Sequence, residues 1–437
     1  MSRGQLVQAL QSKTRSTLAH CLVLLWTHYE PQLSDVENGL RAANIQPLAI
    51  RRLAGNLDAD QCGARLRGLL GDDADFDEFA LAWLKSLDRW LHQNLKPTAL
   101  AGTVLTGVDG KPHRIYPRNN FIADTYEDRD ELPTWVAQQG HSMAAYAPHV
   151  VIEPADKLIG KFRLELRRCD RSAWSRLQQL RDGQSLRVMM WPLAVRIDYP
   201  DLDKLRQTPP PEFVSLRDPR NEEVLGIEVE QALQEAARLE TTVLIFPELA
   251  IPPRVIRRVR AFLARQKGHG HPILTVMGLC HACPRKRGAD VNEAVVLGPN
   301  GTELYRHRKL APFAVGQQYP CGERLQTGST LTVLESPIGN LVTLICLDFF
   351  HSEVLPLVNS SLANVMLVPS LSPTTSAHQH SAATLGASRL ASTFVCNRWV
   401  VDKGKDATSF YRVPRKIDGQ VCHIPDHARL PYLLFEL

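Results

Sequence analysis

Long hydrophobic runs are what the sequence most plainly lacks. Its longest apolar stretch, Leu18 to Trp26, already contains His20, whereas a membrane span needs about 18 or more apolar residues in succession. The N-terminus also lacks the order of basic, apolar and small residues that marks a secretory signal peptide. We therefore expect that the protein is cytoplasmic and does not associate with a membrane.

A disulfide framework is absent as well. The nine cysteines are an odd number scattered over 437 residues, unlike the densely paired cysteines of small secreted domains. Charge of one sign is not in excess either, because 51 basic and 46 acidic residues leave a net charge of +5. This balance of charge gives no reason to expect nucleic acid as a partner. The odd number of cysteines leaves room for one that works as a free thiol.

The length of the chain favours two domains. In the first hundred residues, apolar side chains recur at helical spacing from Leu6 to Tyr29, from Leu57 to Leu70 and from Asp75 to Leu95, which predicts three helices. Val104 to Tyr116 has the pattern of a hairpin turned at Asp109-Gly110. We therefore predict a mainly helical N-terminal domain over residues 1–185, without recognisable chemistry but available to a protein partner.

The pattern changes at Leu186. From there, short apolar strands alternate with helices, as in the helix Asn221 to Glu240 followed by the strand Thr241 to Phe246. Two hairpins, turned at Pro299-Asn300-Gly301 and near Pro337-Ile338-Gly339, lie in the middle. This succession predicts an α/β layered domain with a mixed sheet. We place it at residues 186–400 and treat residues 401–437 as a C-terminal arm.

Three reactive residues stand where apolar strands end. Glu248 follows a strand that ends near Phe246, Lys309 lies just past a strand that ends at Arg306, and Cys346 follows the run Val342 to Ile345. Burial raises the pKa of a carboxylate toward the range of a general base. A cysteine that opens a turn into a helix meets backbone N–H groups that favour its thiolate. Each residue alone has an ordinary structural explanation, but together they form a candidate catalytic site.

With these residues in order, the chain resembles the nitrilase superfamily of carbon–nitrogen hydrolases. The resemblance runs from Leu186 to about Asn397 and rests on the stretches AARLETTVLIFPEL, NEAVVLGPNGTELYRHRKL, SPIGNLVTLICLDF, NVMLVPSLSP and ASTFVCN. It implies a four-layer α-β-β-α sandwich and the hydrolysis of a small-molecule amide, through a cysteine thioester and without metal or organic cofactor. It also implies that Cys346 is the nucleophile, Glu248 the base and Lys309 the cation that stabilises the oxyanion.

The resemblance further implies neighbours that shape the substrate site. The backbone N–H of Leu347 would help to bind the oxyanion, and Asp348 and Phe349 would line the pocket or support it. Many family members carry a second acid shortly after the lysine. Here Gln317 stands in that stretch, as a candidate to bind substrate or orient Lys309, and the first acid downstream is Glu323.

Three alternatives stay open at this stage. His307 is a second candidate for the position of Lys309, although only the lysine carries a permanent charge. Cys280-His281-Ala282-Cys283 has CxxC spacing, but zinc needs four converging ligands, and we expect no metal. The basic helix Pro253 to Lys267 has the arginines of a solvated face, with nucleic acid as the minority interpretation.

The function also has a second interpretation. A nitrilase-like domain with weak or no hydrolysis would serve as an assembly or partner-binding module, which the missing second acid suggests. Family members commonly form homo-oligomers through surface helices and C-terminal arms, and the arm here ends in Pro431-Tyr432-Leu433-Leu434-Phe435. Within the first interpretation, an amine that intercepts the thioester would turn hydrolysis into acyl transfer.

Overall fold

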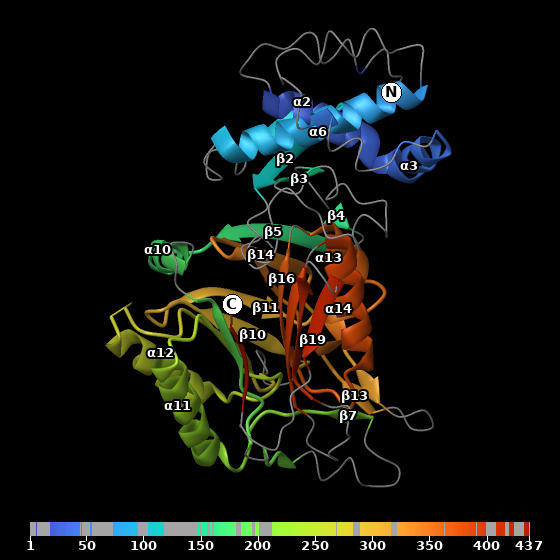
Figure 1. Ribbon diagram of the computed structural model, residues 1–437. Coiled ribbons are helices and arrows are strands. Elements are labelled where there is room, and N and C mark those ends of the chain that lie inside the picture. Colours follow the sequence, from blue (N-terminus) through green and yellow to red (C-terminus); the bar gives the residue numbers. More distant parts are fainter. Residues whose placement is uncertain are drawn as a thin grey trace. The chain divides into compact units, whose positions relative to one another are not determined.

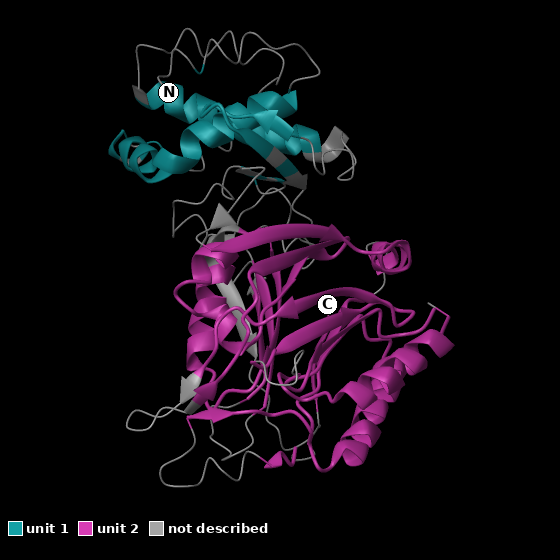
Figure 2. Cartoon of the chain, turned by 180° about the vertical axis from the view of Figure 1, so that it is seen from behind, with its two compact units in different colours: residues 1–119, 129–157, 387–389 teal, residues 120–128, 158–386, 390–437 magenta. Residues whose placement is uncertain are grey.

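The chain forms two compact units in the computed structural model (Figure 2), namely residues 1–119, 129–157 and 387–389, and residues 120–128, 158–386 and 390–437. The structure describes residues 6, 18–43, 45, 53–54, 73–94, 104–117, 147, 150–154, 158–159, 161–180, 185–194, 197–200, 212–267, 269–282, 289–315, 321–361, 363–389, 391–398, 408–415, 419–423 and 432–436. The predicted helix over Leu57 to Leu70 lies outside these residues. Among the helices described, none combines the length and the hydrophobicity that crossing a membrane demands.

The first unit is built from helices and one small sheet. Its described elements are α2 (Leu18–Tyr29), η2 (Glu30–Gln32), α3 (Leu33–Ala42), α6 (Asp73–Asn94), β1 (Val104–Thr106), β2 (Pro112–Pro117) and β3 (Val150–Pro154). The buried hydroxyl of Tyr29 donates to Asp77 at 2.9 Å and so ties α2 to α6. Pro31 lies in the 3-10 turn η2, which leads directly into α3. The hairpin around Asp109-Gly110 is confirmed, and it pairs further with β3.

The second unit contains two large mixed sheets. One has the strand order β11-β10-β9-β8-β6-β20 and the other the order β19-β18-β17-β16-β15-β14-β5-β4. The first consists of β6 (Arg187–Met190), β8 (Val243–Ile245), β9 (Leu274–Gly278), β10 (Glu293–Leu297), β11 (Glu303–Arg308) and β20 (Leu433–Glu436). The second consists of β4 (Leu158–Ile159), β5 (Phe162–Arg168), β14 (Thr330–Ser336), β15 (Gly339–Thr343), β16 (Val365–Ser370), β17 (Ser392–Asn397), β18 (Phe410–Arg415) and β19 (Gly419–His423).

Successive side chains of each strand face opposite sides of its sheet, so that the two sheets and two pairs of helices pack in four layers. On β8, Val243 and Ile245 face the other sheet, while Leu244 faces the helices α11 (Glu222–Arg238) and α12 (Pro253–Arg265). On β16, Val365 again faces the space between the sheets, and Met366 faces α13 (Leu355–Ser360) and α14 (Ser376–Arg389). Because side chains alternate faces along a strand, each sheet is apolar on both sides. The predicted α-β-β-α sandwich is thus confirmed, with α11 and α12 on one outside and α13 and α14 on the other (Figure 1).

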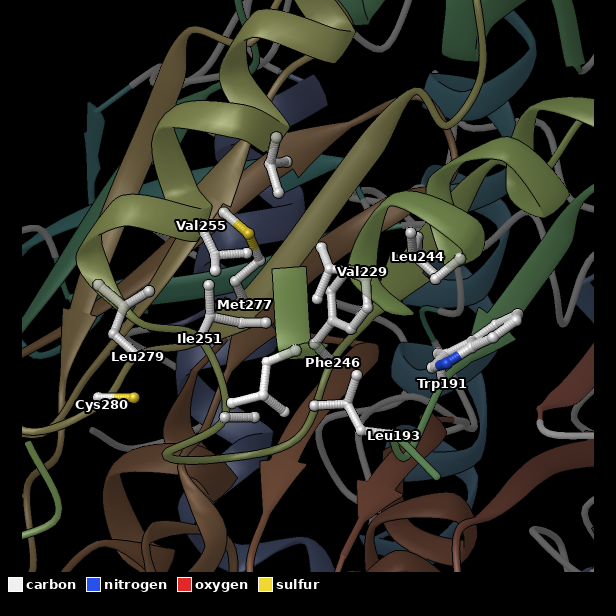
Figure 3. Close-up of a cluster of buried hydrophobic side chains, with 14 of the residues drawn as sticks. Trp191, Leu193, Val229, Leu244, Phe246, Ile251, Val255, Met277, Leu279 and Cys280 are labelled. Atoms are coloured by element: carbon white, nitrogen blue, oxygen red, sulfur yellow. The ribbon is translucent and has the colours of Figure 1, made fainter. Parts of the chain in front are cut away.

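The hydrophobic cluster between the six-stranded sheet and the helices α11 and α12 extends to the ends of β8 and β9. Val229 of α11 and Val255 of α12 pack on Leu244, Phe246 and Met277 of the sheet (Figure 3). The same cluster continues into loop residues that follow the strands, among them Leu249, Ala250, Ile251 and Cys280. The loops beyond β8 and β9 are therefore fixed by the core.

The limits of the second unit differ from the boundaries that the sequence suggested. The strand β5 and the helix α10 (Arg171–Leu180) lie within residues 1–185, yet β5 pairs in parallel with β14 of the eight-stranded sheet. In the proposed C-terminal arm, β18 pairs with β17, and β20 pairs with β6. The described parts of the arm therefore belong to the sandwich.

Candidate active site

Glu248 lies in a tight turn after β8. Leu249, which follows it, has a φ of 54°, a left-handed conformation that is uncommon for a residue other than glycine. The turn lies against Gly278 of β9, where a Cβ atom would come within 2.5 Å of the Cα of Glu248. Only glycine fits at this close approach. The turn therefore holds the Glu248 carboxylate, which is 1% exposed, in one place.

Lys309 is the cation that meets Glu248. It follows β11 directly, is fully buried, and its Nζ lies 2.7 Å from Oε1 of Glu248. His307, the alternative candidate, lies two residues earlier and hydrogen-bonds Asp348 at 3.0 Å instead. The geometry thus selects Lys309 over His307 as the neighbour of the carboxylate.

Glu323 completes a buried charged cluster that the sequence did not reveal. It ends the short strand β13 (Cys321–Glu323), and its Oε2 lies 2.6 Å from Lys309 Nζ. Asn292 bridges the two carboxylates, because its Nδ2 donates to Glu248 and to Glu323, at 2.8 Å each. A second acid is therefore present after all. Gln317 lies outside the described residues.

The sequence contained a signal for Glu323, namely that it is the first acid downstream of the lysine. Its distance of 14 residues from Lys309 hid the relation. The pairing needs the small sheet in which β13 lies between β12 (Ala314–Val315) and β7 (Phe213–Val214). No local pattern announces such a sheet, whose strands come from distant parts of the chain.

Cys346 stands on a strained turn after β15. Its φ is 46°, and it opens the short 3-10 helix η5 (Cys346–Phe349). A left-handed conformation at a cysteine costs free energy and, where it occurs, is a mark of functional sites. The C-terminal end of β16 lies beside it, because Ser370 and the backbone of Leu371 both act to lower the pKa of the Cys346 thiol. The backbone N–H of Leu371 also donates to Oε2 of Glu248 at 3.1 Å.

The protonation states differ from the expectation of a resting thiolate. Burial and the Glu248 carboxylate raise the pKa of the Cys346 thiol to about 12, against the opposing effect of Lys309. The turn is a 3-10 helix of four residues, which supplies less of the helix-end field than an α-helix. Cys346 is therefore a thiol at neutral pH, and its proton needs an acceptor.

Glu248 is suited to accept that proton. Burial raises its pKa, Lys309 opposes this effect, and the neighbouring charge of Glu323 adds to it. For Glu323, the charge of Lys309 and the hydrogen bond from His281 outweigh burial and hold its pKa at about 2. Burial lowers the pKa of Lys309, but the two carboxylates outweigh it and keep the ammonium charged. The surroundings thus raise the pKa of one acid and lower that of the other, and a raised pKa brings a carboxylate closer to the working range of a general base.

Asp348 is committed to the protein. Its Oδ1 accepts from the backbone N–H groups of Leu310 and Ala311, at 2.9 Å each, and its Oδ2 accepts from His307 and Ile345. With no exposed surface, Asp348 fastens the turn of Cys346 to the loop after Lys309. Of the two roles expected of Asp348, lining the pocket or supporting it, these contacts favour the second.

The two neighbours of Asp348 have different surroundings. Phe349 is fully buried in the core between the eight-stranded sheet and its helices, so it supports the site from below. Leu347 is half-buried and packs on the same cluster.

The remaining candidates take structural positions. Cys280 lies 2.9 Å from the Tyr199 hydroxyl, whereas His281 belongs to the network of Glu323; Cys283 lies outside the described residues. The searched part of the chain contains no group of three metal-binding side chains. On the basic helix α12, Arg254, Arg258 and Arg260 pair with Glu222, Glu223 and Glu303. Such pairs are typical of a solvated face.

Known proteins resemble this chain at low identity. An amidase from Nesterenkonia sp. is 15% identical over 58% of this chain and 90% of its own, with a TM-score of 0.39. Nit3 from Saccharomyces cerevisiae, a member of branch 10 of the nitrilase superfamily, is 17% identical over 58% and 90%, with a TM-score of 0.37. A glutamine-dependent NAD+ synthetase from Acinetobacter baumannii is 16% identical over 58% and 45%, with a TM-score of 0.40.

A family profile matches part of the second unit. No curated protein matches the chain. Residues 206–397, however, match the profile of the carbon-nitrogen hydrolase family, and this range contains Glu248, Lys309, Glu323 and Cys346. Over residues 206–397, the chain is therefore similar to the carbon–nitrogen hydrolase family.

Proposed function

We propose that this domain hydrolyses a non-peptide amide or a related C–N bond through a thioester on Cys346. One observation carries the proposal: a buried carboxylate with a raised pKa, a buried ammonium and a thiol on a strained turn converge at the ends of β8, β11 and β15. A nucleophile, a base and a fixed cation are the parts that acyl transfer from an amide requires.

The first half of the reaction forms the thioester. Glu248 takes the proton of Cys346 as the sulfur attacks the amide carbon, and the substrate oxygen becomes an oxyanion. Lys309 and the backbone N–H of Leu347 stabilise this oxyanion. Collapse of the intermediate breaks the C–N bond, and Glu248 returns the proton to the leaving ammonia or amine. The products of this half are the thioester and the amine.

The second half releases the acid. Glu248 takes a proton from water, and the resulting hydroxide attacks the thioester carbon. The C–S bond then breaks, and the proton on Glu248 returns to the sulfur. The sum is amide plus water to acid plus amine, with the enzyme unchanged. An amine in place of the water would give acyl transfer by the same steps.

The test combines a substrate screen with a probe that needs no substrate. Ammonia release would be measured over a panel of small linear amides. In parallel, brief treatment with limiting 2-chloroacetamide at neutral pH, followed by peptide mass spectrometry, would compare the labelling of Cys346 with that of the other cysteines. We expect Cys346 to react fastest, and Glu248→Gln to slow both the labelling and any turnover, the latter by about a thousandfold.

Matched variants separate chemistry from folding. Cys396→Ala removes another buried free cysteine, and Glu335→Gln neutralises another buried acid with a raised pKa. Both controls should keep the wild-type rates, whereas Cys346→Ala should abolish turnover. If Cys346 reacts no faster than Cys396, or if Glu335→Gln slows labelling as much as Glu248→Gln does, the proposal is wrong.

The alternative of an inert assembly module loses its main motivation. It rested on the missing second acid and on the large unrecognised half of the chain. Glu323, a buried carboxylate 2.6 Å from Lys309, removes the first of these reasons. A homo-oligomer, a protein partner for residues 1–185 and a cytoplasmic setting remain proposals beside the catalytic one.

A further inference from the structure

His281 is a fully buried imidazole at the far side of the charged cluster. It follows β9 by three residues, and its backbone N–H donates to the carbonyl of Leu216 at 2.8 Å. Its side chain has no exposed surface and contacts two partners through its two ring nitrogens. Nδ1 lies 3.0 Å from the backbone nitrogen of Leu216, and Nε2 lies 3.0 Å from Oε1 of Glu323.

These two contacts determine where the ring proton is. The backbone N–H of Leu216 can only donate, so Nδ1 must carry a lone pair and accept. In a neutral imidazole the proton then belongs to Nε2, which donates it to the Glu323 carboxylate. The doubly protonated ring would place two N–H groups against each other at Leu216. The geometry therefore fixes the neutral Nε2–H form.

The hydrogen bond at Nε2 determines how Glu323 is oriented. Oε1 of Glu323 accepts from His281 and from Asn292, while Oε2 faces Lys309 Nζ at 2.6 Å and the backbone N–H of Phe313 at 3.2 Å. The donors on Oε1 hold the carboxylate so that its other oxygen points at the ammonium. Another acid lies near the other ring nitrogen of His281. Asp290 is 3.9 Å from Nδ1 of His281 and is itself paired with Arg217.

We infer that His281 is a positioning residue of the active site: as a fixed Nε2–H donor it aims Glu323 at Lys309, and through Lys309 it sets the reactivity of Cys346. This inference rests on the proposed hydrolytic function. His281 touches neither the substrate nor the sulfur. Its effect passes along a chain of three buried contacts, from His281 to Glu323, from Glu323 to Lys309, and from Lys309 to Glu248.

Two conservative substitutions distinguish this role from a structural one. In His281→Gln, the side-chain amide reaches the place of Nε2 and can still donate to Glu323. In His281→Asn, the side-chain oxygen takes the place of Nδ1 and can still accept from Leu216, but its amide falls short of Glu323. A positioning role predicts that Gln is the mild substitution and Asn the harmful one. A structural role, in which the contact with Leu216 matters, predicts the reverse order.

The first experiment measures the labelling rate of Cys346 by 2-chloroacetamide in the full chain, and turnover on any amide found in the screen. We expect His281→Asn to lower turnover by about tenfold to a hundredfold, the range for the loss of a hydrogen bond to a charged group, with kcat affected more than KM. Labelling should slow in the same order. His113→Asn is the matched control, because His113 is also buried and bonded to an acid, Asp109, within the first unit; it should leave both rates unchanged.

A double-mutant cycle tests whether His281 acts through Glu323. If His281 acts through Glu323, then His281→Asn should cost little in a Glu323→Gln background, measured by labelling. Equal costs in both backgrounds, or a milder effect of Asn than of Gln, would overturn the inference. Because labelling needs no turnover, the two proposals fail separately. If no amide is hydrolysed but the order Gln above Asn holds, only hydrolysis is refuted; if hydrolysis is measured and the order reverses, only the role of His281 is refuted.

Discussion

The four acceptor contacts of Asp348 make it a test of how the site is held together. Substitution by Asn would turn one acceptor oxygen into an amide that faces donors, such as the backbone N–H groups of Leu310 and Ala311. Leaving buried hydrogen-bond partners unsatisfied costs about 1–3 kcal/mol for each group. We expect Asp348→Asn to lower the free energy of unfolding by about 2–4 kcal/mol, measured by urea denaturation.

The control for that variant is Asp198→Asn. Asp198 is half exposed and pairs with Arg220 at 3.6 Å on the surface, where an ion pair contributes about 0–1 kcal/mol. Equal losses of stability in the two variants would contradict the anchoring role of Asp348.

Glu323 should make the stability of the protein depend on pH. Its pKa is about 2 in the folded state, below the value of about 4.3 in an unfolded chain. A lowered folded pKa stabilises the protein above about pH 4.3, and this contribution is lost as the pH falls toward about 2. We expect Glu323→Gln to be less stable than wild type at pH 7, and the difference to shrink from about pH 5 to about pH 3.

Urea denaturation over that pH range measures the effect. Glu353→Gln removes an exposed acid that pairs with Lys161, and it should show almost no difference from wild type at any pH. A gap between Glu323→Gln and wild type that stays constant down to pH 3 would show that the folded carboxyl is not held ionised.

At the scale of residues, the members of the site that follow directly after a strand could be predicted from the sequence, whereas those in loops and short strands could not. Glu248, Lys309 and Cys346 each follow an apolar run, so their position at a sheet edge could be predicted. Glu323, Asn292 and His281 reach the same cluster through β13, through the turn before β10 and through the loop after β9. Their meeting depends on tertiary contacts that have no local pattern.

At the scale of elements, Gly278 controls the placement of the turn that holds Glu248. Its Cβ position would lie 2.3 Å from the carbonyl oxygen of Pro247, and backbone at that distance must move. We expect Gly278→Ala to displace Glu248, to cost about 1–3 kcal/mol of stability, and to lower turnover by about a hundredfold. Labelling of Cys346 and thermal unfolding would measure the two effects.

The control for Gly278 is another glycine with free space around it. Gly39 lies in the helix α3, and a Cβ there would meet nothing within 4 Å. Gly39→Ala should raise stability by up to about 1 kcal/mol, because alanine favours a helix. A Gly278→Ala variant with wild-type turnover would mean that the turn can adjust without moving the carboxylate.

Elements with strong periodicity were predicted within a few residues of their bounds, as for α11 and α12. The strand β5 was not predicted from the sequence. Its residues FRLELRR include four charged ones, and the strand lies near the open edge of its sheet. α10 escaped for the related reason that only Ala173, Leu177 and Leu180 of its ten residues are buried. A half-exposed element gives a weak hydrophobic pattern.

At the scale of the whole molecule, the boundary between the units has a direct test. We propose that the second unit needs β4, β5 and α10 in order to fold, because β5 pairs with β14 along six residue pairs. A fragment of residues 158–437 should fold and keep the reactivity of Cys346. A fragment of residues 186–437 should be insoluble or unfolded, since it exposes β14 as a new edge. Circular dichroism and labelling of the two fragments decide the matter, and equal behaviour would return the boundary to Leu186.

In the proposed reaction, the buried group of Glu248, Lys309 and Glu323 also determines how charge moves. Glu248 accepts hydrogen bonds from Lys309, Asn292 and the backbone N–H of Leu371, as a carboxylate does. Two carboxylates beside one ammonium give the site one net negative charge. When Glu248 takes the thiol proton, it becomes neutral while the substrate oxygen becomes negative, so the total does not change. In a medium of low dielectric constant, creating a new charge is costly and moving an existing one over a short distance costs far less. The site therefore reaches its transition states by relocating a charge that the fold already holds.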